Sequence, residues 1–241
     1  IYIVITGDIK FQIVRDDGYK IIGQPYQVYC IENNYKIDLQ STNKSVYGYI
    51  SISENFILKK FWGSFSVNTK AKIGSNNGEK ITNKQKIIIE HKNRNITETS
   101  LKYTNSKIEY IRAIKSTNFD FFSDKSKKTF FHKEFKVTKL SDRMGMRLEG
   151  QVLKNIVDSN IKSEGLVKGV IQVPSDGNPI IMLSDHGTIG GYPKIANVIS
   201  ADFDKLVQMI PGSIIKFKEV NLDEAEKLFQ FYNLETNNLI N

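Results

Sequence analysis

The sequence is poor in the residues that form disulfides and bind metals. It has one cysteine, Cys30, and three histidines among 241 residues. A single cysteine excludes an internal disulfide and favours a reducing, cytoplasmic setting. The same shortage argues against a structural zinc site, so we expect no bound metal in this chain.

Long apolar runs are also missing from the sequence. No stretch approaches the roughly 20 apolar residues that a membrane helix needs. The opening residues, Ile1 to Asp8, lack the basic and apolar blocks of a secretory signal. We therefore expect a protein that neither spans a membrane nor is secreted.

Several well-known catalytic motifs do not occur in the chain. It has no Walker phosphate loop, no dinucleotide-binding glycine pattern, no His-Glu-x-x-His and no Gly-x-Ser-x-Gly elbow. These absences argue against P-loop hydrolases, dinucleotide-dependent dehydrogenases, zinc proteases and α/β-hydrolases.

The formal net charge is +8, but most lysines are scattered, as on a solvated surface, so we expect no nucleic-acid partner. The segment Arg112–Lys139 is the exception, because lysines interleave with phenylalanines there. Such a segment can form a stacking platform for single-stranded nucleic acid. The alternative, which we prefer, buries the rings and turns the lysines to water. The residues concerned are Lys125, Lys127, Lys128, Lys133, Lys136 and Lys139, with Phe119, Phe121, Phe122, Phe130, Phe131 and Phe135.

Short runs rich in Val, Ile, Tyr and Phe dominate the chain, with turn-forming residues between them, and this pattern predicts a mainly β fold of the barrel or sandwich type. The predicted strands are Tyr2–Thr6, Phe11–Val14, Gln27–Ile31, Tyr35–Asp38, Val46–Ile52, Lys86–Ile89, Lys107–Ala113, Lys136–Lys139, Met146–Glu149, Val170–Val173, Ile180–Leu183 and Ile214–Glu219. Three short helices are predicted: one within Phe119–His132, one over Ala201–Met209 with Ser200 as N-cap, and one over Leu222–Tyr232 with Asn221 as N-cap.

The ends of the chain and one internal segment suggest how it is divided. Ile1 to Asp8 resembles a core strand with nothing before it, which would leave an unpaired edge. We therefore expect a truncated domain, or one that a second polypeptide completes. A boundary is expected near Glu90–Ser100, which is polar and aperiodic, and the tail Glu235–Asn241 is expected to fray.

Chemistry-bearing residues gather between Ser141 and Lys194. The loop 184–194 offers a carboxylate, an imidazole, a hydroxyl, an ammonium and two adjacent glycine amides, which can hold an anion or a developing oxyanion. The alternative is a tight Gly190-Gly191 turn in which His186 caps a backbone group. The polar residues of this loop are Asp185, His186, Thr188 and Lys194.

Two further elements belong to the same region. A strand at Met146–Glu149 places Arg147 and Glu149 on one face, and Arg143 with Arg147 could grip a carboxylate, although a surface Arg–Glu pair is an equal alternative. Gln172 stands in an otherwise apolar strand, where a buried amide needs partners. Glu164 is either a general base or merely exposed.

In order and spacing, these residues resemble a carboxyltransferase-domain family. That family includes the C subunit of 5-oxoprolinase, allophanate hydrolase subunit 2, the antagonist of the sporulation kinase inhibitor, and part of urea carboxylase. The resemblance rests on Ser-Asp-Arg-Met-Gly-x-Arg-Leu-Glu-Gly from Ser141, Glu164-Gly165, Gly-x-Ile-Gln-Val-Pro from Gly169, and Gly-Gly-Tyr-Pro-Lys-Ile from Gly190. Weaker landmarks at Thr6-Gly7-Asp8, Gly63-Ser64 and Ile73-Gly74 extend it over nearly the whole chain.

The first half departs from the family pattern at two places. Glu54-Asn55 stands where the family tends to carry a Gly-Gly pair. Gly63-Ser64-Phe65-Ser66-Val67 replaces Gly-Ser-Arg-Ser-Thr, and the loss of that arginine would weaken anion binding there. These departures keep a non-catalytic, regulatory role open as an alternative.

The resemblance implies cyclophilin-like β-barrel subdomains: an incomplete one at 1–95 and a second at 101–234 that carries the main motifs. It implies one component of an ATP-dependent 5-oxoprolinase that converts 5-oxo-L-proline, ATP and water to L-glutamate, ADP and phosphate. The implied cofactor is ATP with Mg. The implied partners are a sister carboxyltransferase-domain subunit of the 5-oxoprolinase B type and the lactam-hydrolysing A-type subunit, with an upstream fragment possible. The alternative is a urea or amide carboxyltransferase, with biotin on a partner, or allophanate hydrolase subunit 2.

The residues that the resemblance favours for chemistry fall into two sets. The candidate catalytic residues are Glu164, Asp185, His186 and Lys194. The candidate substrate- or phosphate-binding residues are Asp142, Arg143, Arg147, Gln172, Thr188, Gly190, Gly191 and Tyr192. Among them, Arg143, Arg147 and Lys194 would hold carboxylate or phosphate charge. The Gly190 and Gly191 amides would hold the carbonyl oxygen, and Glu164, Asp185 or His186 would move protons.

Overall fold

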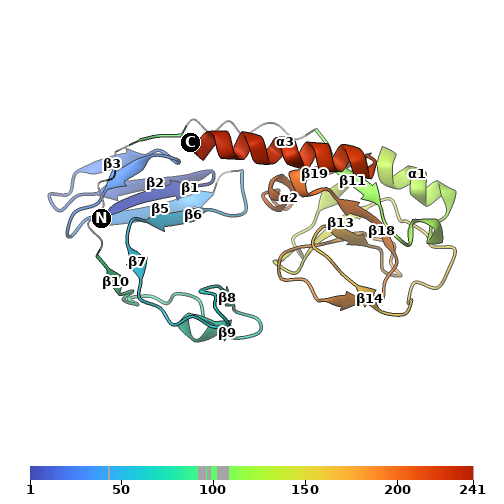
Figure 1. Cartoon of the computed structure of the whole chain (residues 1–241), viewed down its shortest axis with the longest axis horizontal. Coiled ribbons are helices and arrows are strands. Elements are labelled where there is room, and N and C mark those ends of the chain that lie inside the picture. Colours follow the sequence, from blue (N-terminus) through green and yellow to red (C-terminus); the bar gives the residue numbers. More distant parts are fainter. Residues whose placement is uncertain (43, 92–95, 97–98, 102–108, 241) are drawn as a thin grey trace. The chain divides into compact units, whose positions relative to one another are not determined.

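The computed structural model describes residues 1–42, 44–91, 96, 99–101 and 109–240 (Figure 1). The chain divides into two compact units, Ile1–Tyr103 and Thr104–Asn241. The predicted boundary at Glu90–Ser100 and the start of the strand predicted at Lys107–Ala113 fall partly outside the described residues. That the first unit is an incomplete barrel stays a prediction.

The fold is mainly β, as predicted, with three α-helices among the described residues. In the first unit the strands are β1 Tyr2–Thr6, β2 Ile9–Val14, β3 Lys20–Gly23, β4 Val28–Cys30, β5 Lys36–Thr42, β6 Tyr49–Ile52, β7 Asn55–Phe56, β8 Val67–Asn68, β9 Ile73–Gly74 and β10 Ile89–Glu90. In the second they are β11 Ile111–Lys115, β12 Glu134–Val137, β13 Gly145–Gly150, β14 Glu164–Gly165, β15 Val170–Gln172, β16 Ile180–Met182, β17 Ile189–Gly190, β18 Lys194–Val198 and β19 Ile214–Glu219.

Seven strands of the second unit close into a barrel, in the order β11-β18-β15-β16-β13-β12-β19. Strand β19 completes it, pairing parallel with β11 and antiparallel with β12. The strands alternate as a barrel wall must: in β13, Met146 and Leu148 are buried while Arg147 and Glu149 face solvent, as predicted. Figure 1 shows β13 and β14 at successive levels of this unit, with β11 and β19 beside the helices.

The phenylalanines of the segment Arg112–Lys139 belong to the barrel core. Phe122, Phe130 and Phe135 are at most 1% exposed, and Phe130 stacks on Phe217 with ring centroids 4.4 Å apart. Helix α1, Asp124–His132, brings Phe130 inward after the short 3-10 helix η2, Phe119–Phe121. The interpretation of this segment as an exposed stacking platform for nucleic acid is therefore wrong, because its large rings already have partners in the core.

The two later helices pack together outside the barrel (Figure 1). Helix α2 spans Ser200–Val207, so Ser200 begins the helix and is not its N-cap, as the sequence had suggested. The residue before it, Ile199, makes no side-chain cap. Instead Asp202 in the first turn accepts hydrogen bonds from the backbone N–H and the guanidinium of Arg112 on β11. A buried ion pair thus ties the helix to the barrel, and it raises the pKa of Arg112.

Helix α3 spans Leu222–Ile240, longer than the predicted Leu222–Tyr232. Its predicted N-cap is confirmed, because the N–H of Glu224 donates to Asn221 Oδ1 over 2.8 Å. The fraying expected for Glu235–Asn241 is wrong as far as Ile240. The tail contains neither glycine nor proline to end the helix.

The first unit contains two three-stranded sheets, β4-β1-β6 and β3-β2-β5, and two ribbons, β10-β7 and β8-β9. Strand β1 is central in its sheet, so the expectation that Ile1 to Asp8 forms an unpaired edge is wrong. Its core is small: Ile3, Ile5, Phe11, Ile13 and Ile31. Among the helices that the structure describes, none is both long enough and apolar enough to cross a membrane.

Candidate functional site

A buried ion pair joins two of the candidate catalytic residues. Lys194 begins β18, and its side chain is only 8% exposed, while that of Glu164 on β14 is 41% exposed. The ammonium of Lys194 donates a short hydrogen bond to Glu164 Oε2. The side chains are 30 residues apart in sequence, so the fold brings them together. A buried ammonium needs such a partner, because burial alone would favour its neutral form.

The pKa of the Glu164 carboxyl lies below its ordinary value. The hydrogen bond from Lys194 is the largest cause, and desolvation opposes it. The charge of Lys194 and a side-chain hydrogen bond with Asn118 act in the same direction as the first. A lowered folded-state pKa means that ionised Glu164 stabilises the fold above its unfolded pKa. That contribution is lost as the pH falls through the folded pKa.

The two-stranded ribbon of β14 and β17 holds Glu164 in place. Glu164 lies opposite Gly190, and Gly165 lies opposite Ile189. The alternative of a tight Gly190-Gly191 turn is wrong, because Gly190 is a strand residue of this ribbon. The use of both glycine amides to hold one oxyanion stays a prediction.

Close packing explains why position 190 is a glycine. A Cβ added there would lie 2.8 Å from Gln172 Nε2 and 2.8 Å from Leu166 Cδ1. Gln172 is 4% exposed, and its Nε2 donates to the carbonyl oxygen of Tyr192 over 3.0 Å. The expected need of this buried amide for a partner is thus met, and Gly190 leaves room for it.

Replacing Gly190 by valine is expected to destabilise the second unit by about 1–3 kcal/mol, because the new side chain must displace the buried Gln172 amide. Gly165→Val is the matched control on the paired strand, where an added Cβ meets nothing within 4 Å. Urea denaturation followed by far-UV circular dichroism measures both variants. Equal midpoints for the two would show that position 190 tolerates a side chain.

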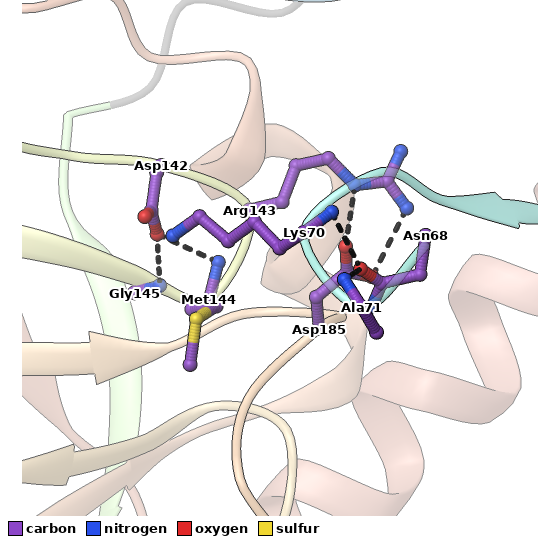
Figure 2. A network of polar contacts seen from close by, with 8 residues as sticks. All are labelled: Asn68, Lys70, Ala71, Asp142, Arg143, Met144, Gly145 and Asp185. Atoms are coloured by element: carbon purple, nitrogen blue, oxygen red, sulfur yellow. Dashed lines mark hydrogen bonds and ion pairs between the residues drawn. The ribbon is translucent and has the colours of Figure 1, made fainter. Parts of the chain in front are cut away.

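A second pair holds the loop that follows β16. Arg143 donates from Nε to Asp185 Oδ2 over 2.8 Å and from an Nη to Oδ1 over 3.0 Å, and Figure 2 shows the guanidinium facing that carboxylate. The N–H of Asp185 also donates to the carbonyl oxygen of Arg143 over 2.9 Å. Asp185 is 19% exposed and Arg143 61% exposed, so the arginine is held in one orientation while much of it remains open to solvent.

Asp142 shapes the turn that carries Arg143. Its Oδ1 accepts hydrogen bonds from the N–H groups of Met144 and Gly145, over 2.8 and 3.1 Å (Figure 2). This is the Asx-turn pattern expected of an aspartate ahead of a strand. The structure therefore shows Asp142 in a supporting role, and a substrate-binding role for it stays a prediction.

The two candidate arginines lie differently. Arg147 extends from the solvent face of β13 and lines a shallow hollow with Thr138, Asp176 and Asn178. The expected Arg–Glu surface pair is replaced by another: Glu149 pairs with Lys136 on the neighbouring strand, over 3.2 Å. A joint grip of Arg143 and Arg147 on one carboxylate stays a prediction.

The remaining loop residues lie near the ribbon. His186 Nδ1 contacts the carbonyl oxygen of Gly187, so the imidazole caps a backbone group, one of the two expectations, and leaves Nε2 for other contacts. Thr188 is exposed, and its carbonyl oxygen accepts from the N–H of Leu166. Tyr192 is 39% exposed and contributes its carbonyl oxygen to Gln172.

Sequence reasoning missed one residue of the site, Asn118. It is 4% exposed, and its Oδ1 accepts from the backbone N–H of Lys194 over 3.2 Å. Nothing marks it in the sequence, because it stands among phenylalanines and far from the other site residues. Only the folded chain brings it to β18.

The chain matches a known family along most of its length. The family described as "Carboxyltransferase domain, subdomain A and B" matches residues 1–219. The chain is similar to the C subunit of 5-oxoprolinase from Haemophilus influenzae, 31% identical over 235 residues, covering 92% of this chain and 75% of that protein. It is also similar to the C subunit of 5-oxoprolinase from Escherichia coli, 32% identical over 199 residues, covering 81% of this chain and 63% of that protein.

Urea-processing proteins are similar over smaller parts of their length. Urea amidolyase of Lachancea kluyveri is 31% identical over 118 residues, covering 45% of this chain and 6% of that protein. The solved structure of the K. lactis urea amidolyase superposes with a TM-score of 0.86 over 99% of this chain and 16% of that one, at 19% identity. This last likeness concerns the fold.

Proposed function

The chain belongs to the carboxyltransferase domain family, subdomains A and B, and on that premise we propose that it is the C subunit of an ATP-dependent 5-oxoprolinase. The complex would open 5-oxo-L-proline with ATP and water, giving L-glutamate, ADP and phosphate. Two relatives that carry the name of this 5-oxoprolinase component, at 31% and 32% identity, support the proposal.

The buried Lys194–Glu164 pair is the observation that carries the proposal. A lactam carbonyl is unreactive until its oxygen is polarised or modified, and a desolvated ammonium stabilises developing negative charge on that oxygen. The lowered pKa of Glu164 makes its carboxylate a weak proton acceptor. We therefore assign Glu164 to orienting Lys194 and accepting the substrate N–H, rather than to general-base catalysis.

The other candidate residues take supporting roles in this proposal. Arg143, which Asp185 orients, and Arg147 would attract the substrate carboxylate or phosphate. His186 would exchange a proton through Nε2, since Nδ1 already contacts a backbone carbonyl. The amides near Gly190 would face the carbonyl oxygen.

The site residues do not fit a magnesium–nucleotide complex. Lys194 and Arg143 are each already paired with a carboxylate. In the described part of the chain, no three His, Cys, Asp or Glu side chains gather where a metal ion could bind. We therefore assign ATP and Mg to a partner protein of the complex, and derive no step of this chain's chemistry through them.

The proposed partners are a sister carboxyltransferase-domain subunit of the B type and the lactam-hydrolysing A-type subunit, and an upstream fragment would complete the first unit. The names of the relatives, which designate them as one lettered component of 5-oxoprolinase, support an assembly of several chains. The chain spans 75% and 63% of those two relatives, so activity and partners of the whole proteins enter only as proposals.

The test is to co-express the chain with its candidate partners and measure ATP hydrolysis with and without 5-oxoproline. Stimulation by 5-oxoproline, with glutamate formed, is expected only when this chain is present. An assembled complex that hydrolyses no additional ATP would overturn the proposal. The same complex with this chain omitted is the control.

The similarity to urea amidolyase favours a second candidate, transfer of a carboxyl group to urea or a related amide, with biotin on a partner. Supplying the assembled complex with urea and a carboxylated biotin carrier tests it. Activity with neither substrate would instead favour a regulatory role.

A further inference from the structure

Asn118 is a buried polar residue that the site so far leaves without a role of its own. It is 4% exposed and lies just before the 3-10 helix η2. Its segment is fixed to the barrel, because the N–H of Ser116 donates to the carbonyl oxygen of Ile195 over 3.2 Å. A buried amide side chain must find partners, and the partners chosen indicate what it does.

The side chain of Asn118 does not serve its own helix. An asparagine at this place commonly caps the helix that follows, but Asn118 makes no side-chain cap. The hydrogen bond that starts η2 is a backbone one, from the N–H of Phe121 to the carbonyl oxygen of Asn118. The side chain is therefore available for a contact elsewhere.

That contact is with both members of the ion pair. Asn118 Oδ1 accepts from the backbone N–H of Lys194 over 3.2 Å. The same side chain hydrogen-bonds the Glu164 carboxylate, and only its amide NH₂ can donate to an ionised carboxylate. One planar group thus spans β18 and β14, at the first residue of one strand and the carboxylate of the other.

We propose that Asn118 is a positioning residue that fixes the Lys194 backbone and the Glu164 carboxylate relative to each other. The amide holds the strand that presents the ammonium and directs one carboxylate oxygen. It also favours the ionised form of Glu164, because an amide donor is satisfied by a carboxylate and not by a protonated carboxyl. The catalytic consequence of this role rests on the proposed function, but the positioning itself does not.

The test uses the Glu164 titration as a readout that needs no partner. In chain labelled with ¹³C-glutamate, the Glu164 carboxyl signal is assigned from its loss in Glu164→Gln. Asn118→Leu keeps the volume and removes both hydrogen bonds. Asn118→Asp keeps the shape and the acceptor for the Lys194 N–H, but places a second carboxyl beside Glu164. Both variants are expected to move the titration midpoint of Glu164 upward.

The assembled complex supplies the second readout. Each variant is expected to lower kcat by about 10-fold or more with little change in KM, and to move the acid limb of the pH profile upward. Asn155→Asp is the matched control, since Asn155 lies in the same unit and donates to Ser159 Oγ. It is expected to leave the Glu164 midpoint unchanged.

An unchanged Glu164 midpoint in folded Asn118→Leu and Asn118→Asp would overturn the proposal, whatever the complex does. A merely structural role predicts that the isosteric Asn118→Asp titrates as the parent chain does. If the parent complex shows no 5-oxoproline activity while both midpoints still rise, the proposed function fails and the positioning role stands. Near-UV circular dichroism establishes that each variant is folded.

Discussion

Lys194→Met is expected to lower the kcat of the assembled complex by about 10²- to 10³-fold, the range found when a preorganised charge donor is removed from an active site. Methionine fills the volume of the buried side chain but cannot polarise a carbonyl oxygen. Glu164 tolerates the loss of its partner, because its carboxylate is 41% exposed and can be hydrated. The measurement is 5-oxoproline-dependent glutamate formation.

Lys136→Met is the matched control for this experiment. Lys136 also pairs with a carboxylate, Glu149, but both side chains are more than half exposed on the barrel surface. Such a pair contributes little, about 0–1 kcal/mol, and full activity is expected. Full activity of Lys194→Met as well would remove Lys194 from the chemistry.

Phe130→Ala is expected to destabilise the second unit by about 3–5 kcal/mol, enough to unfold a marginally stable domain. Phe130 is fully buried, and its ring stacks on Phe217 and contacts Phe131 and Phe135. Removing it leaves a cavity where α1 meets the barrel. Since the only tryptophan, Trp62, lies in the first unit, far-UV circular dichroism in urea is the appropriate measurement.

Phe229→Ala serves as the control for the loss of an aromatic ring. Phe229 on α3 is 41% exposed, so its removal is expected to cost about 1 kcal/mol or less. Equal costs for the two substitutions would contradict the placement of Phe130 at the centre of the core.

Periodicity predicted the barrel strands whose residues alternate. The bounds of β1 and β19 are those expected from the sequence, and β13 differs by one residue at each end. Strand β18 was not predicted, because Lys194 to Val198 follows a Gly-Gly-Tyr-Pro sequence that indicates a loop. The two-residue strands β14 and β17 exist only through their mutual pairing, and no local pattern signals that.

The candidate site shows the same division between local and long-range information. The turn made by Asp142 and the need of Gln172 for a partner could be predicted, since each depends on residue type and immediate neighbours. The role of Asn118 could not, because its partner Lys194 lies 76 residues further along the chain. Likewise, Glu164 and Lys194 were separate candidates until the fold paired them.

The closure of the barrel by its last strand has a consequence during synthesis. Without β19, the strands β11 and β12 are two open edges with unpaired backbone groups. Those edges stay exposed while the ribosome still holds the segment Ile214–Glu219, and hydrophobic residues of the half-built wall are exposed with them. The nascent chain therefore passes through an aggregation-prone interval, during which it is a client for chaperones that shield β edges.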